Sequence, residues 1–429
     1  MLQAPIPSFQ RFAHQVEVYA RVAEHAPLFP RPALAAATVQ DLLSVARSRG
    51  LLLTGGRFTG KSTFLRHDLL PLLRSDPSLY PIVIDFMAHE EAEPGAVILQ
   101  TLCAELQSQD GVVRRTARKL GLTGLSLGGM QMSPVQAEAD DFKGVLKMLR
   151  ALSAKTGRRL ILLLDEVQRT QTSDHGRRVL LSLARSVNSL NVDARPGPRI
   201  LATGSHAHKL RKMTFGKEDA FHGATVRALP PLGGDYLQWL HAQVPVRGRP
   251  SSGLMASAFD RLLHRPRDLI SVCQVLASYD GNPQHVIDRM FHLLVEECAD
   301  DGKTEFLLHL RDLPDLPLAL SRVMAEAGPE FAPFQLWCKR LTAALVQARR
   351  KLPAPPEFTE GEISDALNVL VARGLIWRGL GFVFEHARFQ RWILSLDPAV
   401  EFGLAAPGGQ PVSALLSVAS EQGAPRLVS

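Results

Sequence analysis

The chain has 429 residues, of which 46% are apolar and 21% are charged, and its formal net charge is +7. At roughly 150 residues per domain, this length predicts about three domains. Ordinary charge content and a mean hydropathy near zero exclude a mainly disordered or fibrous chain. The longest apolar runs are about as long as residues 160–164. They fall far short of the roughly 20 residues that span a bilayer, so no membrane span is expected.

The N-terminal residues have neither the basic start nor the apolar stretch of a secretory signal, which predicts a soluble, cytoplasmic protein. Positive net charge is compatible with a nucleic-acid partner but does not identify one. The cysteines show no CxxC spacing, which favours reduced core thiols over a zinc site or a disulfide framework. They are Cys103, Cys273, Cys298 and Cys338.

The first half of the chain alternates helix and strand patterns. Residues 1–48 are expected to form a helical lead-in, with an apolar-periodic stretch over 38–49. Strands are expected at 51–53, 80–87, 159–164, 199–203 and, more weakly, 224–229. Helices are expected from about 61, at 95–107 and at 139–155. A hairpin insertion is expected at 120–133. Strands separated by helices predict an α/β fold with a mostly parallel sheet covered on both faces.

The second half is predominantly helical. Helices are expected first at 235–243, 252–263, 266–278 and 284–300. They are followed by a helix from about 304 and by helices at 335–351 and 359–373. Short strands at 375–378 and 382–385 and a helix at 387–396 complete the order. This order is typical of a helical domain followed by a winged helix. Thr359 and Glu362 form a T-x-x-E capping box. We therefore expect a lead-in at 1–48, an α/β domain at 49–232, a helical lid at 233–302, a winged-helix domain at 303–396 and a flexible tail at 397–429.

One motif in the α/β domain has a clear phosphate chemistry. The stretch GGRFTGKS matches G-x-x-x-x-G-K-[ST] directly after an apolar strand and before a helix. Glycines there let successive backbone N–H groups surround phosphate oxygens at a helix N-terminus. Lys61 would neutralise the phosphates and Ser62 would place its hydroxyl on Mg²⁺. The candidate binding residues are Gly55, Gly56, Arg57, Phe58, Thr59, Gly60, Lys61, Ser62 and Thr63.

Polar residues at two later strand ends complete the predicted site. Asp165 and Glu166 follow a buried strand, where Asp165 would hold Mg²⁺ and Glu166 would deprotonate the water that attacks the γ-phosphate. The alternative is a strand that simply ends at charged residues. Thr203 or Ser205 would hold that water or contact the γ-phosphate, unless they only form a polar turn. His206 and His208 form H-x-H without any further ligand pattern.

The helical lid supplies one more candidate. Pro266 suits the first turn of a helix, and Arg267 beside it would reach across the cleft to the γ-phosphate. Nucleotide state would then set the angle between the domains. The alternative is a solvated arginine beside Asp268.

Together these motifs resemble P-loop ATPases of the AAA+ and STAND group, and archaeal-type ATPases in particular. The resemblance rests on GKSTFL with the later LLPLLR, on DEVQ at 165–168, on Thr203-Gly204-Ser205, and on the segment from 221 to 232. It implies that Phe29 and Arg31 border the adenine and that Pro266-Arg267 is the second sensor. Where the family often has an arginine finger after a glycine, this chain has Ala224, with Arg227 and Arg211 as the nearest substitutes.

Three functions remain open from the sequence. The leading hypothesis is an ATP-binding and hydrolysing switch, using Mg²⁺, that changes contacts with a protein partner and can form a homo-oligomer on ATP binding. The second is a DNA-binding loader or regulator of the replication or transposition type. It is weakened because the third helix of the winged helix carries Glu360, Glu362 and Asp365, whereas basic residues gather at 114–119 and 339–351. The third is a nucleotide-stabilised scaffold that hardly hydrolyses.

Overall fold

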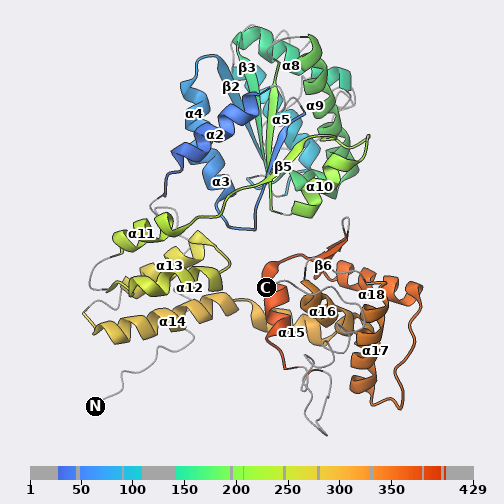
Figure 1. The fold of residues 1–429 in the computed structure, drawn as a ribbon. Coiled ribbons are helices and arrows are strands. Elements are labelled where there is room, and N and C mark those ends of the chain that lie inside the picture. Colours follow the sequence, from blue (N-terminus) through green and yellow to red (C-terminus); the bar gives the residue numbers. More distant parts are fainter. Residues whose placement is uncertain are drawn as a thin grey trace. The chain divides into compact units, whose positions relative to one another are not determined.

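The computed structural model of the chain describes residues 28–44, 49–88, 91–108, 142–193, 197–205, 207–244, 248–277, 281–328, 333–378, 381–397 and 401. The chain divides into two compact units, Met1–Phe291 and His292–Ser429. The first unit holds a parallel sheet with its helices and a group of lid helices (Figure 1). The hairpin expected at 120–133 lies outside the described residues.

A five-stranded parallel sheet forms the centre of the first unit, which confirms the α/β prediction. Its strands are β1 (Leu51–Thr54), β2 (Leu79–Asp85), β3 (Arg159–Asp165), β4 (Arg199–Gly204) and β5 (Thr225–Ala228), in the order β2-β3-β4-β1-β5. The register pairs Leu53 of β1 with Thr203 of β4, and Leu163 of β3 with Leu201 of β4. The carboxyl ends of β1, β3 and β4 therefore meet at one edge, where ligands bind in open α/β sheets.

Helices cover both faces of this sheet because alternate strand residues point to opposite sides. In β3, Leu160, Leu162 and Leu164 pack in the core below α5 (Pro94–Ser108), α8 (Phe142–Thr156), α9 (Asp174–Asp193) and α10 (Ala207–Phe215). Ile161 and Leu163 pack on the other face, against α2 (Pro32–Leu43) and the helix that follows β1. Each face thus has its own apolar core, and the sheet edge between them stays open for polar residues.

The helix after β1 is interrupted by a wide turn. It begins as α3 (Lys61–Thr63), continues as a π-helical segment, η3 (Phe64–Leu69), and ends as α4 (Leu70–Ser75). Pro71 lies in the first turn of α4, where its missing N–H is tolerated. The proline therefore follows the wide turn, and the helical path continues through it. Such π-helical turns are frequent at functional sites.

Two local differences from the sequence expectation have simple reasons. The lead-in helix spans Pro32–Leu43 and begins at a proline, earlier than the periodic stretch over 38–49 indicated. The 3-10 helix η4 (Val167–Thr172), α9 and α10 were not anticipated, although α9 is 20 residues long. α9 has Arg177, Arg178 and Arg185 among its apolar positions, which hides its buried stripe in the sequence.

The lid consists of α11 (Gly234–Gln243), α12 (Ser252–Arg261), α13 (Pro266–Ala277) and the start of α14 (Gln284–Asp300). Beyond the end of α12, Leu263 and His264 have positive φ values of 58° and 53°. This end brings Arg265 and the first turn of α13 into place. Left-handed conformations at two adjacent residues with side chains are uncommon, and such positions cluster at functional sites.

The second unit has the expected element order from residue 335 onward, and one helix more than expected before it. Its elements are α15 (Lys303–Arg311), α16 (Asp315–Ala327), α17 (Leu336–Arg350), α18 (Glu360–Ala372), the antiparallel pair β6 (Ile376–Arg378) and β7 (Phe382–Phe384), and α19 (Ala387–Leu394). The predicted capping box is confirmed: the Glu362 N–H donates to Thr359 Oγ1 at 3.2 Å, and the Thr359 N–H donates to the Glu362 side chain at 2.8 Å. Where one helix was expected from about 304, Pro314 separates two.

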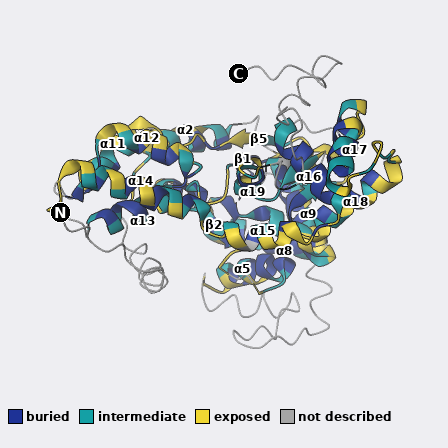
Figure 2. Cartoon of the chain, turned by 90° about the horizontal axis from the view of Figure 1, so that it is seen from below, coloured by how far each residue is buried: buried dark blue, intermediate teal, exposed yellow. Residues whose placement is uncertain are grey.

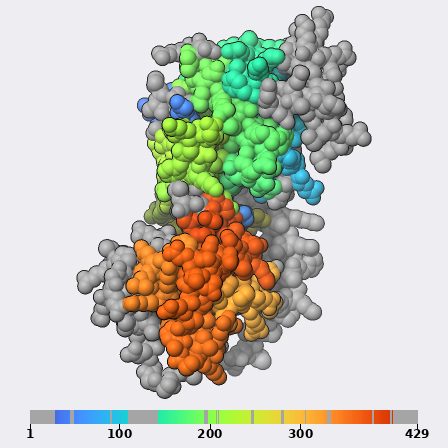
Figure 3. All heavy atoms as spheres, turned by 90° about the vertical axis from the view of Figure 1, so that its right-hand side faces the viewer, coloured from blue at the N-terminus to red at the C-terminus, as the bar shows by residue number. Residues whose placement is uncertain are grey.

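A buried arginine ties this unit together. Arg322 of α16 donates from Nη1 to the carbonyl oxygens of Ile393 and Leu396 at 3.0 and 3.1 Å, which satisfies the open end of α19. Along α17 and α18, buried and exposed residues lie on different sides of each helix (Figure 2). The packed atoms of the unit are coloured orange to red in Figure 3. Among the described helices, none has the length and apolar character needed to cross a membrane.

Candidate functional site

The phosphate-binding motif forms a loop between β1 and α3. Gly60 has a φ of 92°, which favours glycine, and a Cβ atom at Gly55 would lie only 3.1 Å from Oγ1 of Thr59. That hydroxyl donates to the Gly56 carbonyl at 2.8 Å. The Gly55 N–H donates to the Gly204 carbonyl of β4 at 3.3 Å. The glycines therefore serve a tight, anchored loop at the N-terminus of a helix, a geometry suited to an anion.

Lys61 lies under this loop. Its side chain is almost fully buried, and Nζ donates to the Gly56 carbonyl at 2.8 Å. Nζ also lies 3.4 Å from Oε1 of Glu166. Burial lowers the pKa of Lys61, and the attraction of Glu166 opposes that shift. The Lys61 ammonium is thus held inside the loop by the Gly56 carbonyl and Glu166.

The two acids at the end of β3 point in different directions. Glu166 has a left-handed backbone, with a φ of 60°, directly after Asp165. Asp165 is 2% exposed and accepts a hydrogen bond from the Thr203 hydroxyl. That hydroxyl in turn accepts the Glu166 N–H at 3.2 Å. The turn therefore sends Asp165 toward β4 and Glu166 toward Lys61, so the sheet edge presents two separate carboxylates.

Glu166 is held by side chains from three elements. Ser205 donates to its Oε1 and Gln168 to its Oε2, while Lys61 lies beside Oε1. Burial raises the pKa of Glu166, but Lys61 and these hydrogen bonds outweigh burial and bring the pKa below its usual value. The group is therefore an ionised, oriented carboxylate, as a proton acceptor must be.

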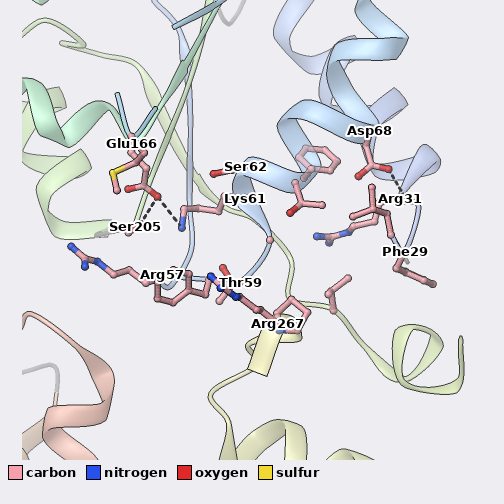
Figure 4. Close-up of a pocket in the computed structure, with 18 of the residues that line it drawn as sticks. Phe29, Arg31, Arg57, Thr59, Lys61, Ser62, Asp68, Glu166, Ser205 and Arg267 are labelled. Atoms are coloured by element: carbon pink, nitrogen blue, oxygen red, sulfur yellow. Dashed lines mark hydrogen bonds and ion pairs between the residues drawn. The ribbon is translucent and has the colours of Figure 1, made fainter. Parts of the chain in front are cut away.

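These residues face a pocket of about 740 Å³ (Figure 4). Predicted residues that line it are Phe29, Arg31, Arg57, Phe58, Thr59, Gly60, Lys61, Ser62, Thr63, Glu166, Ser205 and Arg267. Four predicted residues lie behind this lining: Gly55 and Gly56 in the loop, Asp165, and Thr203. Asp165 and Thr203 would act on a bound group only through a neighbour or a water.

One end of the pocket is aromatic and involves residues 28–31, the linker that precedes α2. The Phe29 ring contacts Tyr236 and Trp239 of α11, with centroid distances of 5.7 and 5.4 Å. The Arg31 side chain donates to the Pro230 carbonyl at 2.6 Å, and its guanidinium lies 5.7 Å from the Phe64 ring centroid. Linker, lid and core are therefore joined at the end opposite Glu166, where a flat apolar ring would find stacking partners.

The lid closes the pocket from another side. Pro266, Arg267 and Ile270 of α13 contribute to the lining, and Figure 4 shows Arg267 extending toward Thr59 of the phosphate loop. The Arg265 guanidinium lies 5.1 Å from the ring centroid of Phe58. Phe58 is 54% exposed and has a φ of 63°. The phosphate loop and the lid thus contact each other directly.

Sequence reasoning missed several lining residues, namely Leu28, Asp68, Met87, Arg169, Leu232, Tyr236 and Ile270. Asp68 follows Lys61 by seven residues and lies in the π-helical segment. Tyr236 belongs to a helix separated from the loop by over 170 residues. The LPPL stretch before α11 resembled a family segment, and this was the one signal near Tyr236.

The weaker candidates have other surroundings. Arg227 pairs with Asp41 of α2 at 2.9 Å, and Arg211 is exposed on α10. His206, and the side chain of His208, lie outside what the structure describes. Within the described ranges, no three His, Cys, Asp or Glu side chains gather as a metal site. Of the two residues expected to hold a metal ion, Ser62 lines the pocket and Asp165 lies behind the lining.

Comparisons with known proteins place this architecture. No protein-family model matches the chain, and no curated protein matches it. Among solved structures the chain is similar to a Walker-type ATPase of Pyrococcus abyssi, with a TM-score of 0.52 and 17% identity, covering 86% of this chain and 99% of that one. It also matches the ORC2 protein of Aeropyrum pernix in ADPNP-ADP complexes, with a TM-score of 0.46 and 15% identity, covering 87% of this chain and 93% of that one. The first likeness shows that the chain has the fold of an archaeal Walker-type P-loop ATPase, as its motifs predicted.

Proposed function

We propose that this protein is an ATP-binding and ATP-hydrolysing switch. The observation that carries the proposal is the meeting of Lys61 and Glu166 at the phosphate loop, in a pocket that Arg267 of the lid also lines. A buried cation under a glycine-rich loop suits a polyphosphate. An ionised carboxylate 3.4 Å from that cation suits activation of water at the terminal phosphate.

The residues fit Mg·ATP on their own geometry. A Cβ atom at Gly60, which lines the pocket, would meet no atom within 4 Å, and the Lys61 ammonium donates to the Gly56 carbonyl of the same loop. Ser62 lines the pocket, and Asp165 would hold the metal through water. Mg²⁺, when bound, neutralises developing charge on phosphate oxygens. Phe29, Arg31 and Tyr236 would enclose the base at the aromatic end.

Glu166 then has a defined task. In the structure its Oε1 shares the Lys61 ammonium with the Gly56 carbonyl. Phosphate oxygens compete for that ammonium, so nucleotide binding frees Oε1 to accept a proton from water. Ser205 and Gln168 keep the carboxylate oriented during this step.

The switch consists of the contacts between loop and lid. Arg267 would sense the γ-phosphate, and the contact between Arg265 and Phe58 ties α13 to the loop that binds phosphate. Loss of γ-phosphate would therefore loosen the lid. We place the nucleotide domain at 49–232, the lid at 233–302 and a winged-helix domain at 303–396. A protein partner, or the winged helix itself, would read the lid position.

The test is ATP turnover by the wild type and Glu166→Gln, with Glu218→Gln as a matched control. Glu218 is an exposed acid that pairs with Arg185 at 2.7 Å, away from the pocket lining. We expect Glu166→Gln to lower kcat by roughly 100-fold or more while ATP still binds, and the control to match wild type. Equal rates in Glu166→Gln and wild type would refute the assigned role. Bound nucleotide without any turnover in wild type would favour the scaffold function.

The DNA-binding alternative gains little from the structure. Arg349 and Arg350 of α17 both donate to Asp315, and Lys339 donates to Glu360. These cations are thus engaged within the unit, and the basic run at 114–119 lies outside the described residues. A duplex titration at low salt tests the alternative, because phosphate contacts are strongest there. Binding that weakens as salt rises would support a loader or regulator.

A further inference from the structure

Asp68 occupies a position in the pocket that the proposed hydrolysis does not use. It lies in the π-helical segment Phe64–Leu69, seven residues after Lys61, and contributes to the lining at the aromatic end. Figure 4 shows it beside Arg31 and Phe29, at the end away from Glu166. This carboxylate lies among aromatic residues and away from the phosphate loop. It is therefore placed to contact a part of the ligand other than the phosphates.

The hydrogen bonds of Asp68 leave one carboxylate oxygen available. Its Oδ1 accepts the backbone N–H of Arg31 at 2.6 Å. The Arg31 guanidinium is directed to the Pro230 carbonyl and the Phe64 ring. Among the described residues, no hydrogen bond or ion pair engages Asp68 Oδ2, and the Arg31 guanidinium is attracted to the carboxylate as a whole. The linker main chain therefore fixes the carboxylate and leaves a single acceptor atom.

The surroundings define what that acceptor can meet. Phe29, Tyr236 and Ile270 give the end of the pocket an apolar wall. Trp239 packs edge-on against Phe29 from outside this lining. A flat heterocycle enters such a slot by stacking. A carboxylate is an acceptor only, so it favours an N–H at the ring edge and repels a carbonyl oxygen.

We propose that Asp68 selects the base of the nucleotide by accepting a hydrogen bond from the exocyclic 6-amino group of adenine. The inference rests on the proposed function, because it takes the pocket to hold a nucleoside triphosphate. A 6-keto purine presents an oxygen where adenine presents its amino group. A carboxylate binds guanine by accepting from the ring N–H and the 2-amino group with its two oxygens. In Asp68 the backbone N–H of Arg31 already occupies Oδ1, so this paired recognition of guanine is not favoured.

The experiment compares equilibrium binding of Mg·ATP, Mg·ITP and Mg·GTP to the full-length protein. ITP is the informative competitor, because inosine carries a 6-keto group in place of the 6-amino group of adenosine. Wild type should prefer ATP to ITP by roughly 10- to 100-fold, the range for a hydrogen bond to a charged group. Asp68→Asn should bring this preference near unity, since a carboxamide can donate to the keto oxygen as well as accept.

The control variant is Arg31→Ala. It keeps the backbone N–H that fixes Asp68 but loses the contacts of the guanidinium. We expect it to weaken ATP and ITP by a similar factor, leaving the preference intact. Asp68→Ala serves as a second variant if Asp68→Asn does not fold, and it should also lose the preference.

The outcomes separate this inference from the proposed function. Binding of ATP with an unchanged ATP-to-ITP ratio in folded Asp68→Asn or Asp68→Ala would overturn the role of Asp68 alone. Equal binding of ATP and ITP by wild type would do the same. Failure of wild type to bind any of the three nucleotides would overturn the proposed function, and base selection with it. A preference that falls only in the Asp68 variants supports the inference.

Discussion

Nζ of Lys61 lies 3.4 Å from Oε1 of Glu166, and both side chains are largely shielded from water. The pair joins the phosphate loop to the end of β3. Because each charge is buried against the other, removing one leaves an uncompensated charge inside the protein. The relationship therefore has consequences for stability as well as for catalysis.

Lys61→Met is expected to destabilise the nucleotide-free protein by about 3 kcal/mol, because Glu166 would lose its cation in a buried site. The double variant Lys61→Met with Glu166→Gln should recover much of this loss. Urea unfolding followed by circular dichroism measures both values. Lys339→Met is the control, because Lys339 and Glu360 form an exposed pair at 3.2 Å, expected to contribute less than about 1 kcal/mol. A loss in Lys61→Met no larger than in this control would contradict the prediction.

Glu401 should make the second unit more stable in mild acid. Both of its carboxylate oxygens are buried without a hydrogen bond to any described residue, and Arg322 Nη1 lies 3.9 Å from Oε2. Burial raises its pKa to about 7, against the opposing attraction of Arg322 and Arg349. The folded state therefore holds a proton that the unfolded state releases, so stability is full below about pH 4.5 and falls as pH rises to about 7.

The expected loss across this window is on the order of 2 kcal/mol, and Glu401→Gln should remove the pH dependence. Tryptophan fluorescence during urea unfolding at pH 5 and pH 8 measures it. The signal weighs toward the second unit, which holds three of the four tryptophans, Trp337, Trp377 and Trp392. Identical pH profiles for wild type and Glu401→Gln would show that Glu401 is not the responsible group.

Gly204→Ala should disturb the site through packing. A Cβ atom at Gly204 would collide with Cδ1 of Leu210 and Oε1 of Gln168, the side chain that holds Glu166. Overpacking of this kind costs roughly 1–3 kcal/mol, and we expect kcat to fall as Gln168 moves. Gly253→Ala is the matched control, because its Cβ would meet no atom within 4 Å and helix propensity should stabilise α12 slightly. Thermal unfolding measures the stability of each variant, and ATP turnover measures its kcat. A Gly204→Ala protein with the stability and kcat of wild type would contradict the prediction.

Phe58→Leu should speed nucleotide release. The Phe58 ring lies 5.1 Å from the Arg265 guanidinium, a cation–π contact of about 0.5–1 kcal/mol at an exposed site. Its loss corresponds to roughly a two- to fivefold faster dissociation, measured by stopped-flow displacement of a fluorescent nucleotide. Leu72→Ala, an exposed change in α4, should leave the rate unaltered. Equal rates for Phe58→Leu and wild type would mean that this contact does not hold the lid.

The sequence predicts well what depends on local pattern. The spacing of Gly55, Gly60 and Lys61 placed the loop between a strand and a helix, and the apolar run before Asp165 placed β3. Both follow from requirements that short segments must meet by themselves: close approach of the backbone for the loop, and burial on two faces for the strand. The capping box at Thr359 is of the same kind.

The site residues that the sequence did not predict depend on contacts between distant segments, or on backbone geometry that residue types do not indicate. Asp68, which lines the pocket, lies in a π-helical turn, and no propensity distinguishes Phe64–Leu69 from an ordinary helix. Tyr236 arrives with the lid, which only tertiary packing brings to Phe29. The positive φ of Glu166, which separates it from Asp165, belongs to a residue type that rarely adopts it.

The wide turn of η3 also affects how this chain is to be compared with others. A π-helical turn holds one residue more than an α-helical turn, so it resets the angular phase of every residue that follows Phe64. A protein without the extra residue would present a neighbouring position to the base end of the pocket. Alignments that count residues from Lys61 would then equate Asp68 with a side chain facing elsewhere, and specificity inferred across such an alignment would be transferred to the wrong position.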